Sequence, residues 1–229
     1  MTRPPEQMPI PLALPARRAR ADFVTAPCNA RALTLIERGD WPAGKLVLSG
    51  PEGSGKTHLL HVWAKAQEAE IVEGSALRAA CVETLASRGA VAVDDAAAVA
   101  GDSAGETALF HLHNLLAAQG GQLLLAARAP VRDWGLRLPD LASRLLAASH
   151  VSLGAPDDAL LAAVMNKLFA DRQVSVPDTL IPYLLPRMTR SLAAAQELVA
   201  RLDAEAIARK KPISLRLAAD VMQMSLFRD

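Results

Sequence analysis

An eight-residue glycine-rich segment, Gly50-Pro51-Glu52-Gly53-Ser54-Gly55-Lys56-Thr57, constrains the fold of this chain more than any other feature. The segment follows an apolar run and precedes residues with helical spacing. Glycines let backbone N–H groups close around phosphate oxygens, and the start of the following helix carries partial positive charge. Lys56 would supply positive charge to the β and γ phosphates, and the hydroxyl of Thr57 suits Mg²⁺. The segment therefore predicts a nucleotide-phosphate loop whose binding residues are Gly50, Gly53, Ser54, Gly55, Lys56 and Thr57.

A second motif, Val91-Ala92-Val93-Asp94-Asp95, is an apolar strand that ends in two acids. In a phosphate-transfer site, Asp94 would hold Mg²⁺ through water and Asp95 would orient the attacking water. Acids end many strands, so this motif gains its meaning from the glycine-rich loop that precedes it. Together the motifs predict ADP or ATP with Mg²⁺ as the ligand, and Thr57 and Asp94 as the metal-binding residues.

Strands and helices alternate over the first two thirds of the chain. Strands are predicted at 45–49, 71–73, 90–94, 122–126 and 150–153, and helices at 29–37, 57–69, 76–87, 106–118 and 141–147. This alternation predicts an α/β fold with right-handed crossovers and a mainly parallel five-stranded sheet. After residue 154 only helical spacing remains, at 157–171, 179–185, 191–209 and 215–222. The expected organisation is an extended tail at 1–20, an α/β nucleotide-binding domain at 21–154, an all-α domain at 155–222 and a tail at 223–229.

Composition narrows the function classes. The formal net charge is +1, so no overall field draws the chain to nucleic acid. The basic cluster Arg17, Arg18 and Arg20 could either touch a phosphate backbone or lie in a solvated linker. The cysteines have no metal or redox spacing, and no signal peptide or membrane-length apolar run is found, which predicts a cytoplasmic protein with no membrane partner. His58 and His61 share a helix face, but neither a Cys nor an acid completes a zinc set.

These features together resemble the AAA+ ATPases, and more closely the bacterial replication-initiator family DnaA. The stretch Gly55–His61 is similar to that family's GKTHLLH, which puts His58 with the nucleotide-binding residues. Phe23-Val24 with Asn29 resembles the segment that leads to the adenine pocket. The resemblance implies an AAA+ P-loop NTPase fold in which the C-terminal helices form a lid.

The resemblance also gives two arginines a role. Asp140–Leu145 is similar to the arginine-finger box, so Arg144 would stabilise the γ-phosphate of a neighbouring subunit, which makes a homo-oligomer conceivable. Met188–Leu192 resembles the sensor-2 region, so Arg190 would reach the phosphates from the lid. The alternative is a surface arginine of a helix for Arg144, and a helix-capping or surface charge for Arg190. One departure is that Ala126-Ala127 and then Arg128 stand where AAA+ proteins place the polar sensor 1. We therefore expect weak intrinsic ATP hydrolysis.

The chain resembles most the Hda type of DnaA-related regulators. Initiators continue into a DNA-reading helix-turn-helix domain, and this sequence ends at Asp229, so no dedicated DNA-binding domain is expected. The resemblance implies two partners, the DNA sliding clamp and the replication initiator DnaA, and association with the nucleoid through the clamp. In that role Arg144 is offered to the nucleotide of the initiator, whose ATP is hydrolysed.

Two short peptides are candidates for clamp binding. Gln7-Met8-Pro9-Ile10-Pro11-Leu12 resembles the N-terminal clamp motif of Hda-type proteins, with Gln7, Ile10 and Leu12 as its anchors. Gln223-Met224-Ser225-Leu226-Phe227 resembles a QxxLF motif, with Gln223, Leu226 and Phe227 as its anchors. The alternatives are an ordinary tail for the first, and packing of Leu226 and Phe227 against the lid for the second.

Three functions remain open at this stage. The first is an AAA+ regulator that docks on the clamp and switches off the initiator. The second is a self-sufficient ATPase, such as a loader that remodels a DNA-bound complex. The third is a DnaA-like helper that brings another protein to DNA. ATP turnover without the clamp, abolished by Lys56→Ala, would favour the second, and the third predicts no clamp binding.

Overall fold

The computed structural model describes residues 19–225, and these divide into two compact units. Residues up to Asp157 form an α/β unit, and residues from Asp158 onwards form an all-α unit. Among the described residues, no helix has both the length and the apolar character needed to cross a bilayer.

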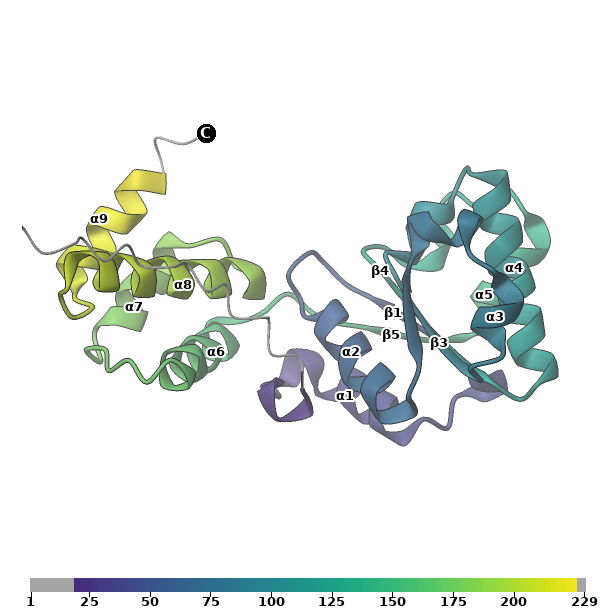
Figure 1. Ribbon diagram of the computed structural model, residues 1–229, viewed down its shortest axis with the longest axis horizontal. Helices are drawn as coiled ribbons and strands as arrows, with labels where there is room; N and C mark the ends of the chain where they lie inside the picture. Colours follow the sequence, from purple (N-terminus) through teal and green to yellow (C-terminus); the bar gives the residue numbers. More distant parts are fainter. Residues whose placement is uncertain (1–18, 226–229) are drawn as a thin grey trace, which may run out of the picture. The chain divides into compact units, whose positions relative to one another are not determined.

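The α/β unit is built on a five-stranded parallel sheet with the strand order β2-β3-β4-β1-β5 (Figure 1). The strands are β1 Lys45–Ser49, β2 Glu70–Glu73, β3 Ala90–Asp94, β4 Gln122–Ala127 and β5 Ser149–Ser152. These bounds agree with the predicted strands to within one residue at each end. Because all five strands run parallel, their carboxyl ends lie at the same edge of the sheet.

Helices cover both faces of the sheet, as Figure 1 shows. The helices α1 Pro27–Arg38 and α2 Lys56–Gln67 cover one face, and α3 Val82–Ala86, α4 Ser103–Ala118 and α5 Pro139–Ala147 cover the other. Side chains alternate along each strand, so Leu46 and Leu48 pack with the first pair while Val47 packs with the second group. A strand that is buried on both faces must be apolar throughout, which explains why β1, β3 and β4 were recognisable as continuous apolar runs.

The predicted helix at 76–87 is wrong. A 3-10 segment, Gly74–Ala79, is followed by an extended Ala80 and the short helix α3. Leu77, Val82 and Leu85 are all buried in one core. In an unbroken helix Leu77 and Val82, five residues apart, would point about 140° away from each other. The break brings both side chains into the core.

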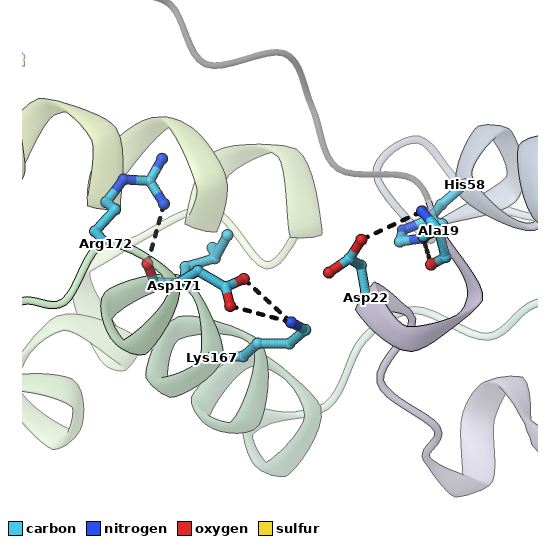
Figure 2. Close-up of polar contacts among 7 residues, drawn as sticks. Ala19, Asp22, His58, Lys167, Asp171 and Arg172 are labelled. Carbon is cyan, nitrogen blue, oxygen red and sulfur yellow. Dashed lines mark hydrogen bonds and ion pairs between the residues drawn. The ribbon is translucent and has the colours of Figure 1, made fainter.

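The all-α unit has its own apolar core. Its helices are α6 Asp158–Asp171, α7 Leu180–Leu184, α8 Leu192–Arg209 and α9 Leu215–Ser225. Met165 and Phe169 from α6 pack with Val199 from α8, and all three are buried. Within α6, the half-buried Lys167 forms an ion pair of 3.1 Å with Asp171 one turn away (Figure 2). The last helix extends to Ser225, beyond the predicted end at residue 222, so Gln223 lies in a helix and is exposed.

One buried charge stands out in the sheet. Lys45, the first residue of β1, is 2% exposed, and its ammonium donates a hydrogen bond of 3.0 Å to the carbonyl oxygen of Gly121. Burial lowers the pKa of Lys45 to about 8. The folded protein therefore releases this proton at a lower pH than the unfolded chain does.

We predict that this lysine makes the free energy of unfolding depend on pH in the alkaline range. Between about pH 8 and pH 10 the unfolded chain keeps the proton that the folded protein has lost, so stability rises with pH. Urea unfolding at a series of pH values measures this slope. The rise should disappear in Lys45→Met, and an unchanged slope in that variant would show that another group is responsible.

Candidate nucleotide-binding site

The glycine-rich loop connects β1 to α2 at the carboxyl edge of the sheet. Gly50, Gly53 and Gly55 have φ angles of 155°, 68° and 98°, which side chains disfavour. A Cβ atom on Gly50 would also lie 2.8 Å from the carbonyl oxygen of Leu153. Glycine at these positions therefore lets the loop take this form without strain, and α2 begins directly after Gly55.

The side chain of Lys56 folds back over the loop. Its ammonium donates hydrogen bonds of 2.8 Å to the carbonyl oxygens of both Gly50 and Pro51. Burial lowers the pKa of Lys56, and Arg128 lowers it further, whereas Asp94, Glu52 and Asp95 act in the opposite direction. The charges of these four residues therefore all act on the ammonium of Lys56.

Ser54 shows that the loop fits a phosphate. Its hydroxyl oxygen is buried and, within residues 19–225, has no hydrogen-bond partner. Buried polar atoms are rarely left without partners, and such an atom inside a glycine-rich turn is ready to donate to an anionic oxygen. The loop, Lys56 and Ser54 are together suited to hold a nucleotide diphosphate.

Thr57 and Asp94 come together from the two sequence motifs. The hydroxyl of Thr57 donates a hydrogen bond of 2.7 Å to Asp94 Oδ2. Asp94 ends β3 and Thr57 follows β1, and only β4 lies between these strands. Both groups offer the hard oxygen ligands that Mg²⁺ prefers, and Mg²⁺ takes its remaining ligands from phosphate and water. The pair is therefore a fitting site for the metal of a nucleotide complex.

Asp95 has a strained backbone. Its φ of 45° is in the left-handed region, and its N–H donates to Asp94 Oδ1 at 3.0 Å. Gly74 permits this turn, because a Cβ atom there would lie 2.3 Å from the carbonyl oxygen of Asp95. The side chain of Asp95 is exposed beside the loop. Such strain is common at functional sites, and the charge of this acid acts on the ammonium of Lys56.

The end of β4 carries a charge that the sequence motifs did not identify as part of the site. Ala126 and Ala127 are buried in the strand, and Arg128 follows them. The guanidinium of Arg128 forms an ion pair of 2.9 Å with Glu52, a residue of the glycine-rich loop. The residue that follows the two buried alanines is therefore a cation that contacts the glycine-rich loop.

Asn29 organises the segment that the resemblance links to the adenine pocket. Its Oδ1 accepts a hydrogen bond of 2.8 Å from the N–H of Ala26, and its Nδ2 donates one of 3.0 Å to the carbonyl oxygen of Val24. Asn29 is 2% exposed, so these bonds are shielded from water. Its role in the structure is to fold the chain just before α1.

His58, in the first turn of α2, meets the same segment. Its ring packs edge-on against Phe23, with 5.3 Å between the centroids. Its Nε2 lies 3.1 Å from the carbonyl oxygen of Ala19, and the N–H of Ala19 donates to Asp22 (Figure 2). His58 thus connects the helix that follows the phosphate loop to the N-terminal segment. Its predicted contact with nucleotide stays a prediction.

Arg144 lies apart from this cluster. It is exposed in the last turn of α5, and its guanidinium carbon is 5.4 Å from the centroid of the Phe110 ring on α4. The pKa of the buried His113 is lowered, mainly by burial, and both Lys45 and Arg144 lower it further. Helix α5 ends at Ala147, and β5 then begins at Ser149, which pairs with Leu46 near the start of β1. Arg144, in the last turn of α5, therefore lies toward the amino edge of the sheet, opposite the glycine-rich loop.

A buried carboxylate supports the helix that carries Arg144, and sequence reasoning missed it. Glu106 is 2% exposed and accepts hydrogen bonds from the N–H groups of Gly101, Arg137 and Leu138 at 2.7 to 2.9 Å. Burial acts to raise the pKa of Glu106, but these backbone donors and the charge of Arg137 more than offset it, so its pKa is lowered. The available signal was an acid in the first turn of a predicted helix, which is too common to single out.

The remaining predicted residues are outside the α/β unit. Arg190 precedes α8 and forms an ion pair with Asp158, both in the all-α unit. Its contact with phosphates stays a prediction. Of the clamp-binding anchors, only Gln223 is described. Gln7, Ile10, Leu12, Leu226 and Phe227 are outside the described residues.

No protein-family profile matches the chain. Its fold is similar to domain III of the replication initiation protein DnaA from Thermotoga maritima, with 17% identity over 90% of this chain and 96% of that one, and a TM-score of 0.76. AMPPCP-bound DnaA from Aquifex aeolicus gives 18% identity over 81% of this chain and 65% of that one, with a TM-score of 0.68. The RuvB Holliday junction branch migration motor of Thermotoga maritima gives 18% identity over 91% of this chain and 72% of that one, with a TM-score of 0.70.

These likenesses show the fold. The chain has the AAA+ P-loop NTPase fold in a DnaA-like form, as the sequence predicted. The chain spans about two thirds of the length of the AMPPCP-bound initiator that it matches.

We predict that Lys56→Ala weakens the binding of ADP and ATP by at least about tenfold, because the loop loses its charged donor to phosphate. Thr57→Val, which keeps the shape of the side chain, should remove most of the gain in affinity that Mg²⁺ produces. Titration of a fluorescent ADP analogue with and without Mg²⁺ measures both effects. If Thr57→Val kept its full response to Mg²⁺, the hydroxyl would have no part in the metal site.

Proposed function

We propose that this protein is an AAA+ regulator that binds adenine nucleotide and Mg²⁺, docks on the DNA sliding clamp, and stimulates ATP hydrolysis by the replication initiator DnaA. In this role it limits repeated initiation of chromosome replication. The nucleotide site stands on the loop geometry, on the orphaned hydroxyl of Ser54 and on the Thr57–Asp94 pair. The partners come from the sequence resemblance.

The position of Arg144 carries the proposal. β1 leads from Lys45, at the edge of the sheet where α5 ends and β5 begins, to Ser49, which directly precedes the glycine-rich loop. Five residues of strand span about 16 Å. An arginine at that separation cannot contact phosphates held in its own loop. It is exposed and oriented by the Phe110 ring, so it is available to a nucleotide on another molecule.

The chemistry of phosphoryl transfer gives such an arginine its effect. Negative charge spreads over the γ-phosphate oxygens in the transition state, and an arginine supplied by a partner molecule increases kcat by roughly 10³ to 10⁵. The planar guanidinium can donate two parallel hydrogen bonds to these oxygens. Glu106, through Arg137 and Leu138, holds the start of α5 in place, which limits the freedom of Arg144.

A self-sufficient ATPase is the second candidate, and one observation favours it. The chain has a residue for each role that ATP hydrolysis requires. Lys56 would bind phosphate, Thr57 and Asp94 would bind Mg²⁺, and Asp95 would orient water. The cation Arg128 in place of a neutral polar residue at the end of β4 argues for weak turnover. Steady-state ATP turnover without clamp or initiator distinguishes the two candidates.

We predict that Arg144→Ala abolishes the stimulation of initiator-bound ATP hydrolysis, with a loss of about 100-fold or more. The assay measures phosphate release from ATP-loaded initiator with DNA-loaded clamp. Arg144→Lys should restore little, because a lysine lacks the planar fork. Arg38→Ala is a matched control, since Arg38 is also an exposed arginine in the last turn of a helix.

The regulator proposal fails if the wild-type protein does not accelerate hydrolysis by the initiator. It also fails if Arg144→Ala accelerates hydrolysis as well as the wild type does. Circular dichroism should show the variant to be folded, because the exposed side chain contributes only its contact with Phe110 to stability.

We predict that both terminal peptides contribute to clamp affinity. Replacing Leu226 and Phe227 by Ala should weaken binding by at least about tenfold, because apolar anchors dominate such interfaces. These substitutions leave α9 intact, whereas deleting residues from 223 would remove its end. Replacing Ile10 and Leu12 by Ala tests the other peptide, and the combined variant should bind most weakly because bivalent attachment is lost. Biolayer interferometry on immobilised clamp gives the affinities, and undiminished binding by the combined variant would rule out both peptides.

A further inference from the structure

The ion pair between Arg128 and Glu52 lies at the centre of the nucleotide site. Arg128 follows β4, which is flanked by β1 with the phosphate loop and by β3 with Asp94. Glu52 belongs to the loop itself, and its carboxylate is 2.9 Å from the guanidinium. The ion pair thus connects the end of the central strand β4 to the glycine-rich loop.

Both side chains of the pair are largely exposed, Arg128 by 68% and Glu52 by 74%. An ion pair in such contact with water contributes little to folding, so either partner can leave it at small cost.

The charges around the loop are arranged to compete. Arg128 lowers the pKa of Lys56, whereas Glu52 raises it, so both charges are felt at the Lys56 ammonium. Phosphates bound beside Lys56 would attract the guanidinium of Arg128 and repel the carboxylate of Glu52. A diphosphate or triphosphate also offers the guanidinium more negative charge than one carboxylate does.

We propose that Arg128 binds a phosphate oxygen of the nucleotide and that Glu52 is an internal anion that competes with the phosphates for it. The pair therefore determines nucleotide affinity and discriminates by phosphate charge. ATP carries one more negative charge than ADP, so Glu52 opposes ATP more strongly. This inference rests on the proposed nucleotide site and is independent of the clamp and of the initiator.

The test is a double-mutant cycle on nucleotide binding by the full chain. The variants are Arg128→Ala, Glu52→Gln and the combination, and isothermal titration calorimetry with MgADP and MgATP gives the affinities. We expect Arg128→Ala to weaken MgATP binding about tenfold, the loss of one charge-assisted hydrogen bond. Glu52→Gln should tighten MgATP binding by about threefold or more, and MgADP binding by less.

The decisive comparison is made in the Glu52→Gln background. If Arg128 binds phosphate, Arg128→Ala still weakens binding there. If Arg128 only neutralises Glu52, the second substitution has no effect, and the inference is overturned. Equal gains for MgADP and MgATP in Glu52→Gln would overturn the discrimination by charge.

Two controls separate this inference from its alternatives. Arg132→Ala removes an equally exposed arginine four residues further along, which pairs with Asp133, and it should leave affinity unchanged. All variants should keep the thermal midpoint of the wild type without nucleotide, because the pair is exposed. Failure of the wild type to bind either nucleotide would overturn the nucleotide site and this inference together. A wild type that binds nucleotide but does not stimulate the initiator would overturn only the regulator role.

Discussion

Strand β1 lies between β4 and β5, and each of its five residues is buried. Helices cover both faces of a parallel sheet. The loops that join strands to helices therefore lie at the ends of the strands. The glycine-rich loop is one of them, and its glycines adopt φ angles that residues with side chains disfavour. Burial of β1 therefore holds Lys56, Thr57 and the start of α2 at one edge, where β3 delivers Asp94.

The two edges of the sheet have different chemistry. The carboxyl edge gathers alternating charges around Lys56, which suits a small, highly charged ligand and a hard cation. The amino edge has the buried ammonium of Lys45, the buried imidazole of His113 and the exposed Arg144. The length of the strands separates the charged groups of the carboxyl edge from those of the amino edge. In the proposed function, the first edge holds the nucleotide of this protein and the second serves that of a partner.

Support for the site comes from groups that do not touch it. Glu106 gathers three backbone donors and so defines the path of the chain into α5, and Gly74 leaves room for the left-handed turn at Asp95. A buried carboxylate is tolerated only when its hydrogen bonds are satisfied, and Glu106 meets that condition. Positioning of this kind limits the motion of Arg144 and Asp95 without any direct contact with ligand.

The sequence alone was sufficient for the position of the glycine-rich loop, the five strands and the change to an all-α region, because these depend on local patterns of glycine and apolar residues. It was not sufficient for the break between Leu77 and Val82, where burial in a shared core overrode helical spacing. It also missed the Glu52–Arg128 pair, because those residues lie 76 positions apart and meet only through the pairing of β4 with β1. Local periodicity determines which elements form, whereas the order of strands in the sheet decides which charges become neighbours.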